Sequence, residues 1–197
     1  MSESDGNYKE LTGVSFSIHP MSDDFVDIIK GSLDEADTSE VMMRTDDVTT
    51  TMKGKLNHVF DVTKAIFIHA AKTKKHIAFQ ATFSMGCPGT PGEPVTLDLD
   101  EDVLNADKVK DIKQYAAAKF ALYPMGGNDV MDLILKQIEG MKNYVTVTPA
   151  DFATRLDGEA AAIFDGLQQI FKETVEAGPN STIMTVSISA NSPSHQG

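Results

Sequence analysis

The hexapeptide FSIHPM at residues 16–21 recurs as FALYPM at residues 120–125, 104 positions further along the chain. Three further pairs match within one residue of that offset: Gly54 with Gly158, VFD at 59–61 with IFD at 163–165, and Ser84 with Ser189. Because these matches fall at both ends and in the middle of each copy, the chain is an internal duplication.

Both copies predict the same order of elements. A short strand ends at a proline, which cannot donate to a β-ladder. Apolar residues then follow at helical spacing. Two short strands, a glycine, a second amphipathic helix and a closing strand come next. The predicted strands are 14–19, 40–44, 48–53 and 76–85 in the first copy and 119–123, 144–148, 152–156 and 182–190 in the second.

The order βαββαβ is the split βαβ, ferredoxin-like pattern, so we predict an α+β fold of two tandem ferredoxin-like repeats. The expected domains are a first repeat at 11–88, an acidic linker rich in glycine and proline at 89–117, and a second repeat at 118–194. In this fold both helices cover one face of an antiparallel sheet. The other face is left for the second repeat, a partner subunit or a ligand to cover.

The uncovered face is predicted to be polar but uncharged. In the two closing strands, apolar residues alternate with Gln80, Thr82 and Ser84 in one copy and with Thr185 and Ser187 in the other. Strands exposed to water usually carry Lys and Glu, whereas Ser, Thr and Gln suit a pocket or a polar interface. An ordinary solvated sheet remains the alternative.

The composition restricts the partners. The chain has 197 residues and a formal charge of −12, which disfavours nucleic acid and anionic membranes because both attract basic surfaces. A neutral polar or cationic ligand fits better. The polar, acidic first ten residues are not expected to form a signal peptide, no apolar run is long enough to span a bilayer, and Cys87 is the single cysteine. We therefore expect a cytoplasmic protein without direct membrane insertion.

An acidic run in the linker resembles part of a calcium-binding loop. Asp98, Asp100 and Asp102 occupy its first three ligand positions, but Val103 and Val109 stand where an EF-hand has glycine and glutamate. A solvated acidic linker is the better interpretation.

No other motif predicts a metal site or catalysis. His58 and His69 would lie about 16 Å apart along one helix at about 1.5 Å per residue, too far to share a metal. The sequence contains no phosphate-binding loop and no nucleophile elbow. We therefore expect no cofactor and no catalytic residues, and we favour a binding protein over an enzyme.

The motif F-[SA]-[IL]-[HY]-P-M in both copies resembles the signature of the YkoF family. The resemblance continues through residues 58–61, 69–71, 83–89, 156–158 and 189–194 and covers the chain apart from its first residues and the middle of the linker. It implies a homodimer that binds thiamine or hydroxymethylpyrimidine (HMP) without catalysis, with one site per repeat on the open sheet faces. It also implies a role in uptake or salvage of the vitamin, linked to an ABC-type HMP transporter.

The candidate ligand-binding residues come from matched positions of the two repeats. They are Ser17, Ile18, Thr50 and Ser84 in the first repeat and Ala121, Leu122, Thr154 and Ser189 in the second. We expect Thr50 and Thr154 to hydrogen-bond the pyrimidine edge. The alternative for Thr50, which shares strand parity with Val48 and Met52, is a hydroxyl tolerated in the core.

Two rival functions use the same sheet face. One is an enzyme that acts on a thiamine-related pyrimidine, and the other is an ACT-like regulatory module in which the ligand alters a partner. The fold alone does not separate these alternatives, because the scaffold hosts many functions.

Overall fold

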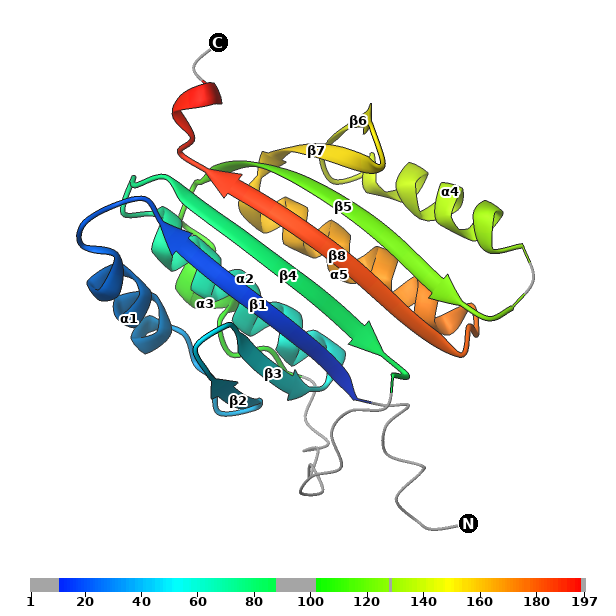
Figure 1. Ribbon diagram of the computed structural model, residues 1–197, viewed down its shortest axis with the longest axis horizontal. Helices are drawn as coiled ribbons and strands as arrows, with labels where there is room; N and C mark the ends of the chain where they lie inside the picture. Colours follow the sequence, from blue (N-terminus) through cyan, green and yellow to red (C-terminus); the bar gives the residue numbers. More distant parts are fainter. Residues whose placement is uncertain (1–10, 88–101, 128, 196–197) are drawn as a thin grey trace.

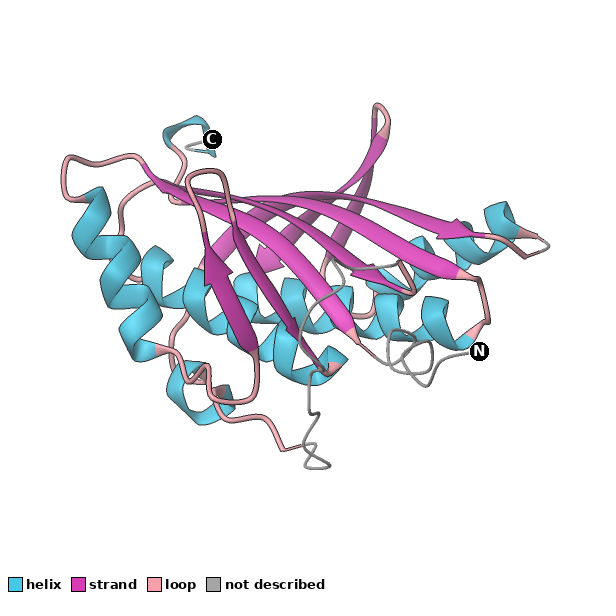
Figure 2. Ribbon diagram, turned by 60° about the horizontal axis from the view of Figure 1, so that its bottom comes forward, coloured by secondary structure: helices cyan, strands magenta, loops and turns pink. Residues whose placement is uncertain are grey.

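The computed structural model describes residues 11–87, 102–127 and 129–195. These residues form one eight-stranded antiparallel sheet with the order β2-β3-β1-β4-β8-β5-β7-β6. All the long helices lie on one side of the sheet, and no long helix of the described residues covers the other side (Figures 1 and 2).

Each half of the sheet is one βαββαβ unit, as predicted. The first repeat contains β1 (Thr12–Pro20), α1 (Phe25–Glu35), β2 (Met42–Thr45), β3 (Thr50–Gly54), α2 (Leu56–Ala71) and β4 (Ile77–Met85). A short helix, α3 (Ala106–Val109), precedes the second repeat. That repeat contains β5 (Tyr115–Met125), α4 (Val130–Met141), β6 (Thr146–Ala150), β7 (Ala153–Glu159), α5 (Ala160–Glu176) and β8 (Ser181–Ala190), followed by a 3-10 turn at Pro193–His195.

The two repeats join edge to edge through their closing strands. β4 pairs with β8 in antiparallel register from Ile77 opposite Ala190 to Met85 opposite Thr182. The second repeat therefore extends the sheet of the first and does not cover its open side. Each repeat also hides the edge strand of the other, which an isolated unit would expose to further pairing.

The repeats share one hydrophobic core beneath this junction. Phe60 on α2 stacks on Phe83 with ring centroids 4.3 Å apart and lies 5.8 Å from Phe171 on α5. Phe67 and Phe164 make a second contact between the repeats at 5.7 Å. Because aromatic rings from both repeats are packed together, neither repeat is expected to keep its core without the other.

The glycines found in both copies stand where the chain passes close to a valine before the second helix. A Cβ added to Gly158 would lie 2.8 Å from Cγ1 of Val145, and one added to Gly54 would lie 3.1 Å from Cγ1 of Val41. A real Cβ does not tolerate the first distance. Packing therefore disfavours a side chain at Gly158, and one at Gly54 would require its neighbours Val41 and Glu40 to shift by a few tenths of an ångström.

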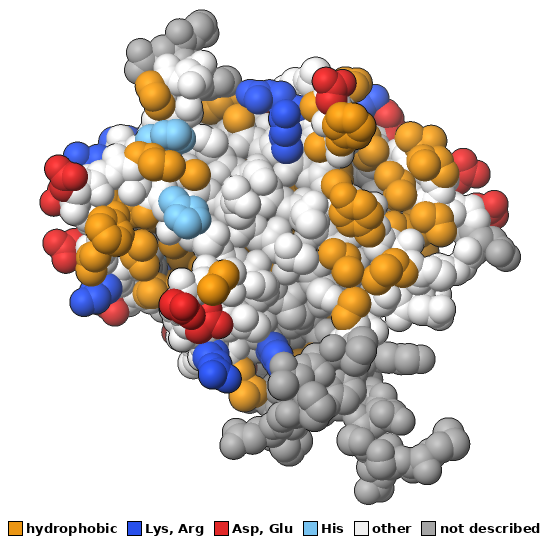
Figure 3. Space-filling view, viewed as in Figure 1, with side chains coloured by type: hydrophobic (Ala, Val, Ile, Leu, Met, Phe, Trp, Pro, Cys, Tyr) orange, Lys and Arg blue, Asp and Glu red, His pale blue; other side chains and the backbone are white. Residues whose placement is uncertain are grey.

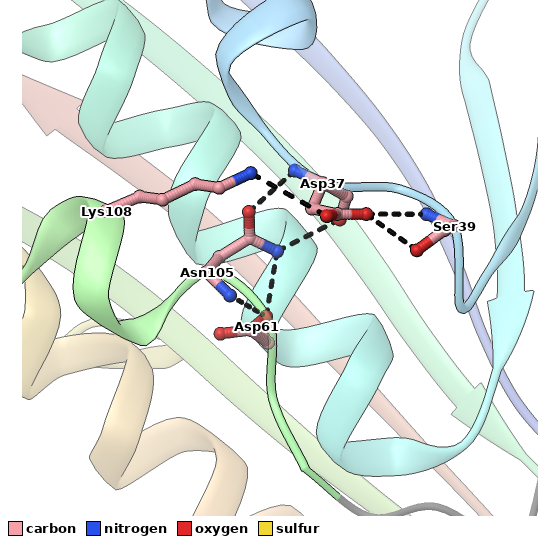
Figure 4. A network of polar contacts seen from close by, with 5 residues as sticks. All are labelled: Asp37, Ser39, Asp61, Asn105 and Lys108. Carbon is pink, nitrogen blue, oxygen red and sulfur yellow. Dashed lines mark hydrogen bonds and ion pairs between the residues drawn. The ribbon is translucent and has the colours of Figure 1, made fainter.

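The described end of the linker is fixed to the first repeat by a buried asparagine (Figure 4). The backbone N–H and Nδ2 of Asn105 donate to Oδ2 of Asp61 at 3.0 and 2.8 Å. Oδ1 of Asn105 accepts the backbone N–H of Asp37, whose carboxylate accepts both the N–H and the hydroxyl of Ser39. These bonds to Ser39 lower the pKa of Asp37, and Lys108 lies 3.8 Å from its carboxylate. We call this hydrogen-bonded group of residues, Asp37, Ser39, Asp61 and Asn105, the clamp. Its polar groups largely satisfy one another in place of water.

Both histidines of α2 are buried. His58 is 3% exposed and His69 is 4% exposed. Nδ1 of His69 lies 3.1 Å from the carboxylate of Glu35, and burial lowers the pKa of His69.

Two further expectations concern the acidic run of the linker and membrane insertion. Asp98 and Asp100 of the acidic run lie outside the described residues. Among the residues that are described, no helix is long and apolar enough to cross a membrane.

Candidate ligand-binding face

The side of the sheet that faces away from the helices, here called the open face, is lined mainly by small side chains. On the inner strands of the first repeat it carries Gly13, Ser15, Ser17, Ala78, Gln80, Thr82 and Ser84. Its centre is neither charged nor hydrophobic, whereas hydrophobic side chains gather over β5 and α4 (Figure 3). This confirms the predicted alternation, because the apolar partners of these residues are buried against the helices.

Two adjoining depressions lie on the open face near the junction of the repeats. One has a volume of about 240 Å³ and lies over Ala78, Ala117 and Ser189. The other has a volume of about 500 Å³ and extends toward the C-terminal turn, past Gln114 and Asn191. They share Ala117, Arg155 and Ser189, so together they form one irregular hollow. The sheet surface is hollowed there because the two residues paired with Ser189 on the adjacent strands, Ala78 and Ala117, have small side chains.

A charged cluster borders this hollow on β5 and β7. Nε and Nη2 of Arg155 donate to the two carboxylate oxygens of Asp157 at 2.8 and 2.7 Å. The hydroxyl of Tyr115 donates to the same carboxylate at 3.1 Å. Burial, followed by this hydrogen bond to Asp157, raises the pKa of the Tyr115 phenol. The fork of Arg155 is thereby held in a fixed orientation.

Histidine and serine side chains form hydrogen bonds on the same face. Nε2 of His76 lies 3.0 Å from the hydroxyl of Ser189, and Nε2 of His19 lies 3.0 Å from the hydroxyl of Ser17. In the tautomer in which the imidazole donates, the hydroxyl proton of each serine is available to a ligand acceptor.

Four of the eight candidate residues lie on the open face. Ser17 and Ser84 flank the centre of the first repeat, and Ala121 and Ser189 do so in the second. Serine hydroxyls are suited to a polar heteroaromatic ring because each can donate and accept.

The other four candidate residues have side chains on the helix side of the sheet. Thr50 lies opposite Phe16 and Thr154 lies opposite Phe120, and both phenylalanines are core residues. Ile18 and Leu122 also pack against the core. The role of all eight residues as ligand contacts stays a prediction. These four would reach a ligand on the open face only through their backbone.

Sequence reasoning did not single out the charged cluster. Lys119 and Arg155 line the hollow and Asp157 pairs with Arg155, yet each is an ordinary surface residue when read alone. One available signal was the duplication itself, since Lys119 corresponds to Ser15 and Arg155 to Thr51 at the offset of 104. Where one copy has a charged residue and the other has a hydroxyl, the open faces of the two repeats differ.

The match to known proteins covers both repeats. A family model described as the YKOF-related family matches residues 11–90 and 115–195. The chain belongs to the YkoF family. One YkoF-family relative from Bacillus subtilis (strain 168), named "Putative HMP/thiamine-binding protein YkoF", is 41% identical over 187 residues. That match covers 94% of this chain and 93% of the relative.

A match to a solved structure covers a smaller part of this YkoF-family chain. A structure titled "Structure of domain of unknown function DUF77 from Bacillus cereus" aligns with 39% of this chain and 75% of its own, at 24% identity and a TM-score of 0.36.

Proposed function

We propose that this protein binds thiamine or HMP on the open face, with one site per repeat, and releases the ligand chemically unchanged. The observation that carries the proposal is the hollow beside Ser189, set in a sheet face of small, mostly uncharged side chains. The relative described above, which carries HMP and thiamine binding in its name, supports it along almost the whole chain.

The chemistry of an aminopyrimidine matches this face. The ring offers an exocyclic amine as a donor and ring nitrogens as acceptors, and serine and threonine hydroxyls can satisfy both. Ser84 in the first repeat and Ser189 in the second occupy corresponding positions. A flat ring lying over these strands would leave the backbone hydrogen bonds of the sheet intact.

The two sites are expected to differ in affinity. Near Ser84 the first repeat has Ser15 and Thr51, whereas near Ser189 the second repeat has Lys119 and Arg155 at the corresponding positions. The first site therefore has two hydroxyls where the second has an ammonium and a guanidinium group. We expect two distinguishable binding events.

The wider role that we propose is uptake or salvage of the vitamin. The protein would act as a homodimer and would be functionally linked to an ABC-type HMP transporter. Exposed hydrophobic residues at one end of the open face and on α4, including Tyr123, Met125 and Met131, provide apolar surface for subunit contact. Light scattering at increasing protein concentration tests the dimer.

Calorimetric titration with thiamine and with HMP tests ligand binding. We expect Ser84→Ala and Ser189→Ala each to weaken a different one of the two events by about three- to tenfold, the effect of one hydrogen bond. Ser22→Ala, in a turn beside α1, serves as the matched control. Absence of heat and of any thermal shift at millimolar ligand would refute the proposal, and NMR of the ligand after long incubation would reveal any product.

A further inference from the structure

Two cations of the second repeat are direct neighbours on the open face. Lys119 on β5 lies directly opposite Arg155 on β7 in the register of the sheet. Directly paired side chains on adjacent strands have Cβ atoms about 4.5–5.5 Å apart, and like charges in that position destabilise the pair. Such a pair is unfavourable unless an anion lies between or beside the two cations.

The carboxylate of Asp157 satisfies only part of this pair. It accepts one N–H from Nε and one from Nη2 of Arg155, which leaves the remaining guanidinium N–H groups available to another acceptor. No described residue forms an ion pair with Lys119. The carboxylate therefore orients Arg155 and leaves Lys119 without a partner among the described residues.

Hydroxyl donors complete the surroundings of the two cations. Ser187 lies directly opposite Lys119 on the other side of β5, and Ser189 lies two residues further along the same strand. Ser187, Ser189, Lys119 and Arg155 all line the smaller depression. Lys74 lines the adjoining one together with Arg155.

We propose that the hollow at the junction of the repeats binds a phosphate monoester of the pyrimidine ligand, with the phosphate held by Lys119 and Arg155 of the second repeat. This proposal rests on the proposed function. A phosphate group offers three acceptor oxygens, and a guanidinium fork and an ammonium group are its usual partners in proteins. The aminopyrimidine ring would lie over Ala117 and Ala78, against the hydroxyls of Ser187 and Ser189.

The first repeat lacks this arrangement at the matched positions. Ser15 stands where the second repeat has Lys119, Thr51 where it has Arg155, and Lys53 where it has Asp157. The first repeat therefore has no oriented guanidinium and no facing pair of cations at these positions. We infer that it prefers the unphosphorylated ligand. The overall charge of −12 does not favour anions, so any preference for the ester must come from groups within about one Debye length.

The test compares HMP with HMP phosphate by calorimetry on the full chain. We expect the wild type to bind the ester at one site at least about tenfold more tightly than HMP, and potassium chloride to weaken the binding of the ester but not that of HMP. Lys119→Ser, which installs the residue of the first repeat, should remove that difference, whereas Lys119→Arg should keep it. Lys136→Ser, at an exposed position on α4, is the control and should change the affinity for neither HMP nor HMP phosphate.

The outcomes separate this inference from the proposed function. Equal binding of HMP and HMP phosphate by the wild type would overturn the phosphate site and leave vitamin binding in place. A loss of dimerisation in Lys119→Ser, with an unchanged affinity for the ester, would also overturn it and would assign Lys119 to subunit contact. Failure of HMP, HMP phosphate and thiamine alike to bind would refute the proposed function itself.

Discussion

The two repeats keep the same interior but present different open faces. Inside, Phe16 corresponds to Phe120, Gly54 to Gly158 and Phe60 to Phe164, and all are buried or closely packed. On the open face, hydroxyls of the first repeat correspond to Lys119 and Arg155 of the second. The duplicated copies therefore retained what packing requires and diverged where no neighbouring element restricts the side chain.

The helix layer shows a second difference. Asp61 is 2% exposed and accepts two hydrogen bonds from Asn105, whereas its counterpart Asp165 is exposed and pairs with Lys64 of the other repeat at 2.9 Å. The same carboxylate in two copies thus fixes the linker in one and bridges the repeats at the surface in the other. Burial decides which of these interactions is costly to remove.

The largest expected effect concerns the core that the repeats share. Phe60→Ala should lower the free energy of unfolding by about 3–5 kcal/mol, because it removes a buried ring that contacts both repeats. Urea denaturation should still show one transition, since the core is common. Phe152→Ala, at a fully exposed position, should change stability by less than about 0.5 kcal/mol. Two separate transitions in the wild type would show that the repeats fold independently.

The matched aspartates should differ in their contribution to stability. Asp61→Ala should cost about 1–3 kcal/mol because it leaves buried N–H groups of Asn105 without an acceptor. Asp165→Ala should cost less than about 1 kcal/mol, because an exposed ion pair contributes little. Denaturation of the two variants side by side measures the difference, and equal losses would contradict the importance of the clamp.

The difference between the open faces can be reduced by a reciprocal substitution. Ser15→Lys gives the first repeat the lysine of the second and should raise its affinity for HMP phosphate by up to about threefold, since the oriented arginine is still missing. Calorimetry of this variant with HMP and its phosphate measures the change. A decrease in affinity for the ester at that site would contradict the assignment of Lys119.

The smallest expected effect is a dependence of stability on pH that arises in the first repeat. Burial lowers the pKa of His69, so the unfolded chain binds a proton more readily than the folded chain. Stability should therefore fall as the pH drops below about 6.5, the ordinary value for histidine. A hydrogen bond from Lys72 lowers the pKa of Glu35, whose contribution is lost only at more acidic pH.

Urea denaturation between pH 7.5 and 5.5 isolates this histidine. His69→Gln should show a smaller loss of stability over that range than the wild type. The second repeat has Glu173 at the corresponding position. An unchanged slope in the variant would assign the acid sensitivity to other groups.

The fold could be predicted because the duplicated hexapeptide revealed the repeat, and the prolines, glycines and apolar spacing shared by both copies gave the order of elements. The faces of β1, β4 and β8 also followed from the alternation of apolar and polar residues. The junction between β4 and β8 did not follow, because alternation defines the two faces of a strand and says nothing about which edges pair.

The candidate site was harder to predict because it depends on register. Residues 49–51 are all threonine, so only the pairing of Thr50 with Phe16 shows that its side chain lies on the helix side. The facing positions of Lys119 and Arg155 likewise follow from the pairing of β5 with β7, which are separated in sequence by α4 and β6. A one-residue shift would place these side chains on opposite faces of the sheet.

A crystal structure with thiamine or HMP bound is the most direct measurement of where the ligand lies. We predict a heteroaromatic ring on the side of the sheet opposite the helices in both repeats, within hydrogen-bonding distance of Ser84 in one and Ser189 in the other. A ring bound among the helices, or an open face filled by side chains of a second subunit with no space for a ring, would contradict the account.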